Sequence, residues 1–82
     1  MFSEISFPTL AAGVDNYPAV LTLQLMLYDL GYFTTKNDLD GVFGERTTEA
    51  VERYQRHKAT TIDGVVGRIT WTYLIGDWWC LK

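Results

Sequence analysis

The chain is poor in the residues that build disulfide frameworks, metal centres and nucleophilic sites. Its 82 residues include a single cysteine, Cys80, a single histidine, His57, and only two serines, Ser3 and Ser6. A lone cysteine forms no intramolecular disulfide, which argues against a disulfide scaffold, and one histidine with one cysteine does not make up a structural zinc set. We therefore expect no metal, no cofactor and no catalytic residues, and we classify the chain as a non-enzyme.

Long apolar runs and a basic character are also absent. No stretch approaches the roughly 18 consecutive apolar residues of a membrane-spanning helix, so we expect no membrane insertion. The opening residues MFSEISFPTL lack a basic start and an apolar run, so they predict no ordinary secretory signal, and the localisation stays unknown. A net charge of −3 and a sequence pI near 4.8 argue against a nucleic-acid partner, which normally requires a basic footprint.

The apolar side chains that are present suffice for one core. Hydrophobic residues make up 48% of the 82 residues, which fits a single domain over residues 1–82 and leaves no room for a second, catalytic one. No lysine or arginine precedes Lys36, whereas basic residues gather in the second half. An anionic ligand must therefore be met locally, and the candidates are Arg56, Lys58 and Arg68.

One octet occurs twice in the chain. The segment DGVFGERT at 40–47 returns as DGVVGRIT at 63–70, an offset of 63 − 40 = 23 residues. A helical pattern of apolar residues follows each copy, so the repeat is a turn that starts a helix. A solenoid needs at least about three such units. We therefore predict an all-α domain, a small three-helix bundle with two repeated DGxxGxxT turn-helix units.

The residue types of the octet explain its turn. The aspartate can accept hydrogen bonds from backbone N–H groups just after it, the first glycine can take a positive φ, and the second glycine suits a helix N-cap. The threonine falls in the first helical turn, so we expect each Asp and Thr pair to close its own loop. These roles are structural, and the alternative is that the closed loops also display donors and acceptors to a ligand. The residues are Asp40, Gly41, Gly44 and Thr47, then Asp63, Gly64, Gly67 and Thr70.

Apolar periodicity and capping residues predict the helix bounds. The first helix should begin near 16–18 and end at Gly31, with a buried stripe at Val20, Leu23, Leu27 and Leu30. The second should run over about 45–57. On its exposed face, Glu49 with Arg53 and Glu52 with Arg56 form i,i+4 pairs in the favourable order.

The third helix should be short and the chain should end in an aromatic tail. We expect this helix over about 68–75, with Gly76 ending it and residues 75–82 following as the tail. Trp78 and Trp79 then have two roles open to them. They can fold back over an apolar groove, or they can contact another chain or a catalytic domain, because aromatic residues favour interfaces.

The order of these segments resembles a known family. VLTLQLMLYDLGY, DGVFGERTTEAVERYQ and IDGVVGRITWTYL together resemble the peptidoglycan-binding domain-like family, three-helix modules of bacterial and phage cell-wall hydrolases. The resemblance covers about residues 8–74. It implies binding of a peptidoglycan stem peptide or muropeptide at the bacterial cell wall, and a cell-wall hydrolase catalytic domain as the partner.

The resemblance also implies a ligand groove, bordered by the two loops and the end of the first helix. Loop backbone groups would grip stem-peptide amides and carboxylates, and Tyr32 or Phe33 would cover the apolar parts. Phe43 and Trp71 have the alternative of being core residues, and Arg68, at a position where the family often has proline, would face an anion. The candidate ligand-binding residues are Tyr32, Phe33, Asp40, Gly41, Phe43, Gly44, Asp63, Gly64, Gly67, Arg68, Thr70 and Trp71.

Three functions follow from these patterns. The first is a non-catalytic peptidoglycan-binding module that targets an associated or fused hydrolase to the wall. The second is a protein-protein interaction or scaffold module that keeps the fold without wall binding. The third, a small lytic enzyme, would need Asp40 and Asp63 as a glycosidase pair. Because the turn motif already explains both aspartates, we set this third function aside.

Overall fold

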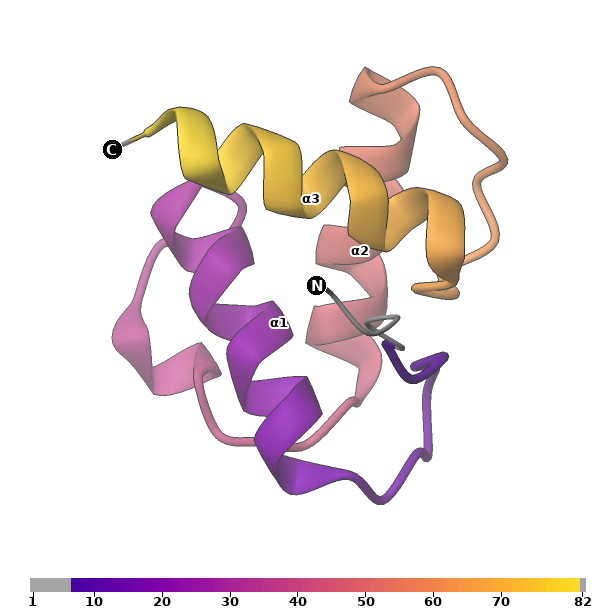
Figure 1. Cartoon of the computed structure of the whole chain (residues 1–82). Helices are drawn as coiled ribbons and strands as arrows, with labels where there is room; N and C mark the ends of the chain where they lie inside the picture. Colours follow the sequence, from indigo (N-terminus) through magenta and orange to yellow (C-terminus); the bar gives the residue numbers. More distant parts are fainter. Residues whose placement is uncertain (1–6, 82) are drawn as a thin grey trace, which may run out of the picture.

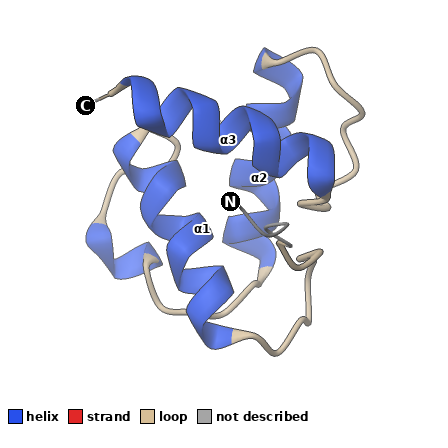
Figure 2. Ribbon diagram, in the orientation of Figure 1, coloured by secondary structure: helices blue, strands red, loops and turns tan. Residues whose placement is uncertain are grey.

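The computed structural model describes residues 7–81, so Ser3 and Ser6 lie outside the described residues. It has three α-helices, α1 (Tyr17–Asp29), α2 (Glu45–His57) and α3 (Arg68–Cys80), and a short 3-10 helix, η1 (Lys36–Asp38). Within the described range Figure 2 shows helices and loops without strands, and β pairing is confined to one isolated bridge between Leu10 and Val66. The predicted all-α three-helix fold is confirmed.

Helix α1 contacts both other helices, and in the view of Figure 1 α3 passes across α2 towards the C-terminal end of α1. The predicted buried stripe of α1 faces this junction: Val20, Leu23 and Leu27 are completely buried, and Leu30 is partly buried. The helix ends where glycine predicted it, because Gly31 has a φ of +93° just after the C-cap.

Helix α2 ends with the same geometry but without glycine. The Thr60 N–H donates to the Gln55 carbonyl at 3.1 Å, as the Tyr32 N–H does to Leu27 at 2.8 Å after α1. The left-handed position is taken by Ala59, with a φ of +57°, where α1 has Gly31. A β-carbon is disfavoured in this region, so Ala59 is a strained residue.

The prediction that Gly76 ends the third helix was wrong. Helix α3 continues to Cys80, so most of the predicted tail is helical. Asp77 accepts hydrogen bonds from the Tyr54 hydroxyl at 2.6 Å and the Lys58 ammonium at 2.8 Å, and Trp78 Nε1 donates to Asp29 at 2.8 Å. These tertiary contacts outweigh the roughly 1 kcal/mol that glycine costs inside a helix.

The two tryptophans of the predicted tail differ. Trp78 is partly buried against the core, as a side chain that folds back would be, whereas Trp79 is 70% exposed. The fold-back prediction therefore holds for Trp78 and is wrong for Trp79.

The segment before α1 crosses between the two repeated loops. Leu10 is completely buried and exchanges two backbone hydrogen bonds with Val66, of 3.1 and 2.7 Å. Three residues on, the Gly13 N–H donates to the Phe43 carbonyl at 3.1 Å. Trp71 Nε1 adds a hydrogen bond of 2.7 Å to the Pro8 carbonyl. This connecting segment, residues 8–13, therefore joins the first loop to the second.

Replacing the strained alanine is expected to stabilise the fold. Ala59→Gly removes the β-carbon from the left-handed position and should add about 1 kcal/mol to the free energy of unfolding, which raises Tm by roughly 4–8 °C for a domain of this size. Gly31→Ala is the matched reverse change, since a β-carbon there meets no atom within 4 Å and only the backbone is penalised. Thermal unfolding followed by circular dichroism measures both. An Ala59→Gly variant no more stable than the native chain would contradict the assignment.

The Asp77 contacts predict a pH dependence of stability. Burial raises the pKa of Asp77, but the hydrogen bonds from Lys58 and Tyr54 outweigh it, and the net pKa lies below its ordinary 3.8. A carboxylate with a lowered pKa stabilises the fold above its unfolded pKa, and that contribution is lost as the pH falls through the folded pKa. Asp77→Asn should therefore cost about 1 kcal/mol at neutral pH, a value that allows for solvent screening.

The difference in free energy of unfolding between Asp77→Asn and the native chain should disappear at acid pH. Urea unfolding near neutrality and well below about pH 3.8 measures it, with Asp15→Asn as a control at an exposed aspartate. A gap of the same size at both pH values would show that the carboxylate does not hold the end of α3.

Candidate functional site

A buried glutamine of α1 organises the first loop. The Gln24 side chain is completely buried, and its amide nitrogen lies 3.0–3.1 Å from three acceptors: Asp40 Oδ1, the Val42 carbonyl and Thr47 Oγ1. Its amide oxygen accepts the Gly41 N–H at 2.8 Å. The carboxamide thus satisfies both donors and acceptors of the turn, and its orientation is fixed by them.

A glutamine of α2 does the same for the second loop. Gln55 is 1% exposed, and its amide nitrogen lies 3.0–3.2 Å from Asp63 Oδ1, the Val65 carbonyl and Thr70 Oγ1. Its oxygen accepts the N–H groups of Asp63 and Gly64 at 3.2 and 3.1 Å. Each DG loop is therefore fastened to the helix that precedes it.

The predicted closure of each loop by its own Asp and Thr is incomplete without a glutamine, although the Thr47 hydroxyl does donate to the Val42 carbonyl at 3.5 Å. The predicted aspartate turn is present, because Asp40 and Asp63 each accept the N–H two residues on at 3.0 Å. The link from aspartate to threonine, however, runs through the glutamine amide. The octet repeat could not show this, because Gln24 lies 16 residues before its aspartate and Gln55 only 8. The sequence signal that could have predicted this role is a glutamine at a position where the helix otherwise presents apolar residues to the core.

The first glycine of each loop is required by both conformation and space. Gly41 and Gly64 have φ values of +76° and +70°, as predicted. A β-carbon on Gly41 would overlap the Tyr17 ring, and one on Gly64 would lie 3.0 Å from the Thr48 methyl. Both glycines are buried, so they shape the loops.

The predicted ligand residues divide by exposure. Phe33, Phe43, Thr70 and Trp71 are 2–7% exposed and belong to the core or to the loop fastening. Phe43 and Trp71, together with those buried glycines, present almost no surface to a ligand, whereas Phe33 and Thr70, although nearly buried, each line a surface hollow. The residues that remain at least partly accessible are Tyr32, Asp40, Gly44, Asp63, Gly67 and Arg68.

The predicted groove is divided: the hollows at the end of α1 and at the first loop share Asp38 and Arg46, whereas the hollow at the second loop shares no lining residue with either. One of about 500 Å³ lies at the end of α1, one of about 200 Å³ at the first loop and one of about 650 Å³ at the second. The physical reason is the connecting segment, residues 8–13, whose buried Leu10 is bonded to the second loop and whose Gly13 is bonded to the first. The two loops therefore do not border one groove.

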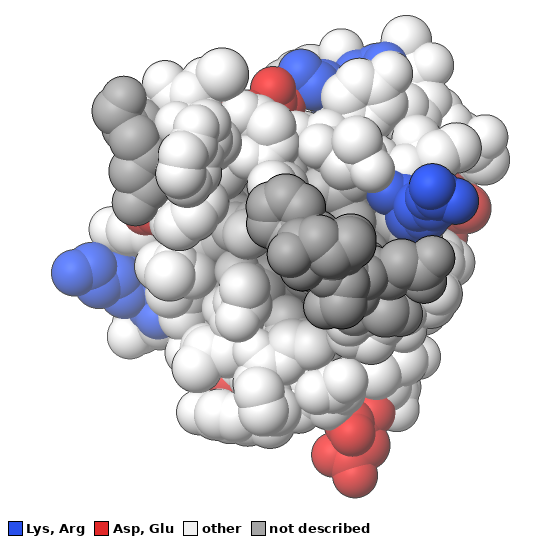
Figure 3. Space-filling view, viewed as in Figure 1, with Lys and Arg blue, Asp and Glu red and all other residues white. Residues whose placement is uncertain are grey.

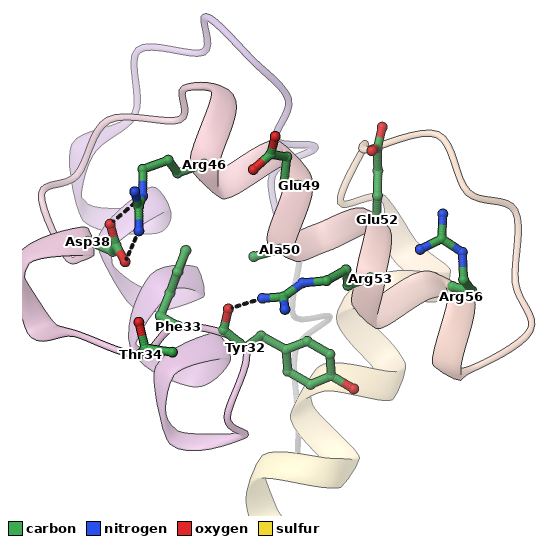
Figure 4. A pocket seen from close by; sticks show the side chains of 10 residues that line it. All are labelled: Tyr32, Phe33, Thr34, Asp38, Arg46, Glu49, Ala50, Glu52, Arg53 and Arg56. Carbon is green, nitrogen blue, oxygen red and sulfur yellow. Dashed lines mark hydrogen bonds and ion pairs between the residues drawn. The ribbon is translucent and has the colours of Figure 1, made fainter.

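The hollow at the end of α1 combines an aromatic ring with charges of both signs (Figure 4). Arg46 is held by Asp38 at 2.8 Å, and Arg53 turns its guanidinium to the Tyr32 carbonyl, with Cζ 5.9 Å from the Tyr32 ring. Arg56, in contrast, makes no side-chain ion pair or hydrogen bond with any described residue. The lining residues are Tyr32, Phe33, Thr34, Asp38, Arg46, Glu49, Ala50, Glu52, Arg53 and Arg56.

The predicted i,i+4 ion pairs of α2 do not form. Among the described residues the ion pairs are Arg46 with Asp38 and Lys58 with Asp77. Glu49 and Glu52 instead project from the helix beside the hollow (Figure 4). Their carboxylates are therefore available to a ligand.

Tyr32 is held as a neutral phenol at the edge of this hollow. Its hydroxyl lies 2.6 Å from His57 Nδ1, and its ring packs edge-on against Tyr54 with centroids 5.3 Å apart. Burial raises the pKa of Tyr32, and the Asp77 carboxylate adds to this effect, while the cations Lys58 and Arg53 oppose it. The ring thus offers an accessible aromatic face with a polar tip.

Asp40 does not have the environment of a general acid. The hydrogen bond from the Val42 N–H is the largest effect on Asp40 and holds the pKa of its carboxyl below the ordinary 3.8, although desolvation opposes it. A general acid would need the opposite shift. Over residues 7–81, no cluster of three or more His, Cys, Asp or Glu side chains is placed to hold a metal ion. No helix in this range is long and apolar enough to cross a membrane.

Comparison with known proteins bears directly on this fold and surface. A family model described as "Putative peptidoglycan binding domain" matches residues 16–74. The chain belongs to this peptidoglycan-binding domain family. The match begins after the connecting segment, so residues 8–13 lie outside it.

The similar proteins agree with the family. The solved N-terminal domain of SleB superposes with a TM-score of 0.79 at 29% identity, covering 92% of this chain and 99% of that one. A peptidoglycan-binding protein from Clostridioides difficile, solved in complex with glutamine hydroxamate, gives a TM-score of 0.73 at 31% identity, covering 83% of this chain and 40% of that one.

One curated relative is longer than this chain. An uncharacterised protein from the bpoA1 3′ region of Kitasatospora aureofaciens is 41% identical over 61 residues, which are 73% of this chain and 50% of that protein. The chain thus spans about half the length of this relative.

Removing either buried glutamine should cost far more than an ordinary surface change. Gln55→Leu leaves the Gly64 N–H, the Val65 carbonyl and the Asp63 carboxylate without their buried partner, and each loss costs about 1–3 kcal/mol. We expect Gln24→Leu and Gln55→Leu each to lower the free energy of unfolding by at least about 3 kcal/mol. Urea unfolding measures the change.

An exposed residue of α2 supplies the control for these variants. Glu49→Leu makes a comparable polar-to-apolar change and should stay within about 0.5 kcal/mol. If the glutamine variants lose no more stability than this control, the loops keep their conformation without hydrogen bonds to the glutamines.

Proposed function

We propose that this chain is a non-catalytic peptidoglycan-binding module that brings an associated or fused cell-wall hydrolase to its substrate. The supporting observation is the hollow at the end of α1, where the accessible Tyr32 ring stands beside unengaged charges of both signs in a chain of this family. The proposal places the action of the chain at the bacterial cell wall.

The chemistry of the hollow matches a stem peptide. Such a peptide presents carboxylates, amides and small apolar side chains. Arg56 offers a guanidinium that no described residue occupies, and planar guanidinium forks suit carboxylates. Glu49 and Glu52 offer acceptors for amines and amide N–H groups, and Tyr32 offers an apolar face.

Weak binding would suffice for this role. An open surface with few contacts leaves little free energy after the costs of ordering are met. A tether to a hydrolase raises the effective concentration of the enzyme near its substrate without any new contact. The relative from Kitasatospora aureofaciens is about twice as long as its match to this chain, which leaves room in that protein for a further domain.

A protein-protein interaction role is the second candidate. The face formed by α1 and α3 shows few charges in Figure 3. Trp79 at 70% and Leu25 at 42% exposure are large apolar side chains on these two helices. Exposed apolar side chains on α1 and α3 suit a catalytic domain that packs against the module, because aromatic and apolar residues favour protein interfaces.

Sedimentation with purified peptidoglycan tests the proposed binding. The native chain should sediment with the walls, and soluble muropeptides should release it. Arg56→Glu should weaken the apparent affinity by roughly fivefold or more, as expected for loss of an ion pair worth about 1 kcal/mol. Lys36→Glu is the matched control, because it makes the same charge change on exposed η1 outside the hollow.

Two results would count against wall binding at this hollow. Native chain that stays in the supernatant at saturating walls would overturn the proposed function and favour the interaction role. Equal losses for Arg56→Glu and Lys36→Glu would show that only net charge matters.

A further inference from the structure

The largest of the three hollows lies at the second loop. It has a volume of about 650 Å³ and sits between the end of α2, the second DG loop and the start of α3. The lining residues are Gln55, Ala59, Thr60, Thr61, Asp63, Val65, Gly67, Arg68, Ile69 and Thr70.

The first loop provides an internal comparison for this hollow. Six positions of the octet line a hollow in both copies, and at the first loop the volume is only about 200 Å³. The two copies differ most in charge at the start of the helix: Glu45 and Arg46 in the first copy correspond to Arg68 and Ile69 in the second. Because the glutamine fastening is the same in both, these differences are not needed to hold a loop.

The two arginines at the helix starts are engaged differently. Arg46 is paired with Asp38 at 2.8 and 3.2 Å. Arg68 is exposed, and its guanidinium makes no ion pair or hydrogen bond with any described residue. The second hollow therefore has an unpaired cation where the first has a neutralised one.

The other walls of the second hollow are apolar or weakly polar. Ile69 is 66% exposed and Val65 is partly buried, so the hollow has accessible aliphatic surface beside the cation. Asp63 uses Oδ1 for Gln55 and the Val65 N–H, and no described residue donates to its other oxygen. The site thus combines a guanidinium, a free carboxylate oxygen and aliphatic side chains.

The chain before the second loop keeps this space open. Ala59 turns the backbone into the left-handed region, and the connection from α2 to α3 swings away from the bundle in Figure 1. Thr60 is anchored by its N–H to the Gln55 carbonyl at 3.1 Å. The wide loop is therefore fixed at its start, and the hollow beneath it is part of the fold.

We propose that this hollow is a subsite for the end of a peptide that carries a free α-carboxylate on a small apolar residue. The inference rests on the proposed function, because it names the part of the stem peptide that this second hollow takes. Arg68 pairs with the carboxylate, Val65 and Ile69 contact the small side chain, and Asp63 accepts a peptide N–H.

The charged groups of the second hollow, Arg68 and Asp63, favour a peptide end with one free carboxylate over other ligands. A guanidinium selects an anion, and a bidentate carboxylate is its best geometric match among peptide groups. Asp63 lines the same hollow and would repel a ligand with a second negative charge. A neutral peptide end would leave Arg68 unpaired, so the subsite separates a free carboxylate from its amide.

An NMR titration of the labelled full chain tests this assignment. The probes are N-acetyl-D-alanyl-D-alanine and the same dipeptide with a C-terminal amide. The acid should shift the amide signals of residues 63–70, and the amide should bind at least about tenfold more weakly, as expected for loss of a charged hydrogen-bond partner. Arg68→Gln should weaken binding of the acid by a similar factor, and Lys36→Gln is the matched control that should leave it unchanged, because exposed Lys36 lines neither hollow.

A second variant keeps the test independent of folding changes at Arg68. Ile69→Glu places a negative charge in the hollow near the start of α3, where acidic residues favour a helix. The chain should stay folded by circular dichroism and lose affinity for the acid. Unchanged binding of the acid to both Arg68→Gln and Ile69→Glu would overturn the subsite.

The outcomes separate this inference from the proposed function. Native chain that sediments with walls while the dipeptide acid leaves residues 63–70 unshifted would overturn the subsite alone. Acid and amide of equal affinity would also overturn it. Native chain that neither sediments with walls nor responds to the acid would overturn both.

Discussion

The rest of the structure depends on one interaction, the hydrogen bonding of a buried glutamine carboxamide to a tight loop. Burying an amide without partners costs several kcal/mol. Gln24 and Gln55 meet that cost by facing acceptors with the nitrogen and loop N–H groups with the oxygen. These hydrogen bonds hold each loop against the preceding helix and so fix the direction in which α2 and α3 start.

Because the same fastening is used twice, comparing the two copies shows which residues hold a loop and at which positions the copies differ. Both copies keep the aspartate, the glycines and the threonine that the carboxamide needs. They differ at the start of the following helix, where Arg46 is neutralised by Asp38 and Arg68 is not. The connecting segment, residues 8–13, is bonded to both loops, so the proposed ligand surfaces lie outside this junction.

Much of the fold could be predicted from residues with strong local meaning. The extent of α1 was predicted from its buried stripe of Val20, Leu23 and Leu27 and from Gly31 at its end, and the DG turns predicted where α2 and α3 begin. The end of α3 could not be predicted, because Gly76 is a local signal while the Asp77 contacts are tertiary. The candidate site was harder to predict. The sequence does not show that Leu10 lies between the two loops and divides the expected groove. The exposure of Phe33 or Trp71 also depends on packing that sequence spacing does not show.

Native-state hydrogen exchange at Gly41 and Gly64 tests the glutamine fastening most directly. Their N–H groups donate to Gln24 and Gln55 inside the structure, so exchange requires the loop to leave its helix. If the carboxamides hold the fold together, both amides should exchange only with the free energy of global unfolding, as the most protected helical amides do. Rapid exchange of either glycine through local opening, with the helices still protected, would contradict the account.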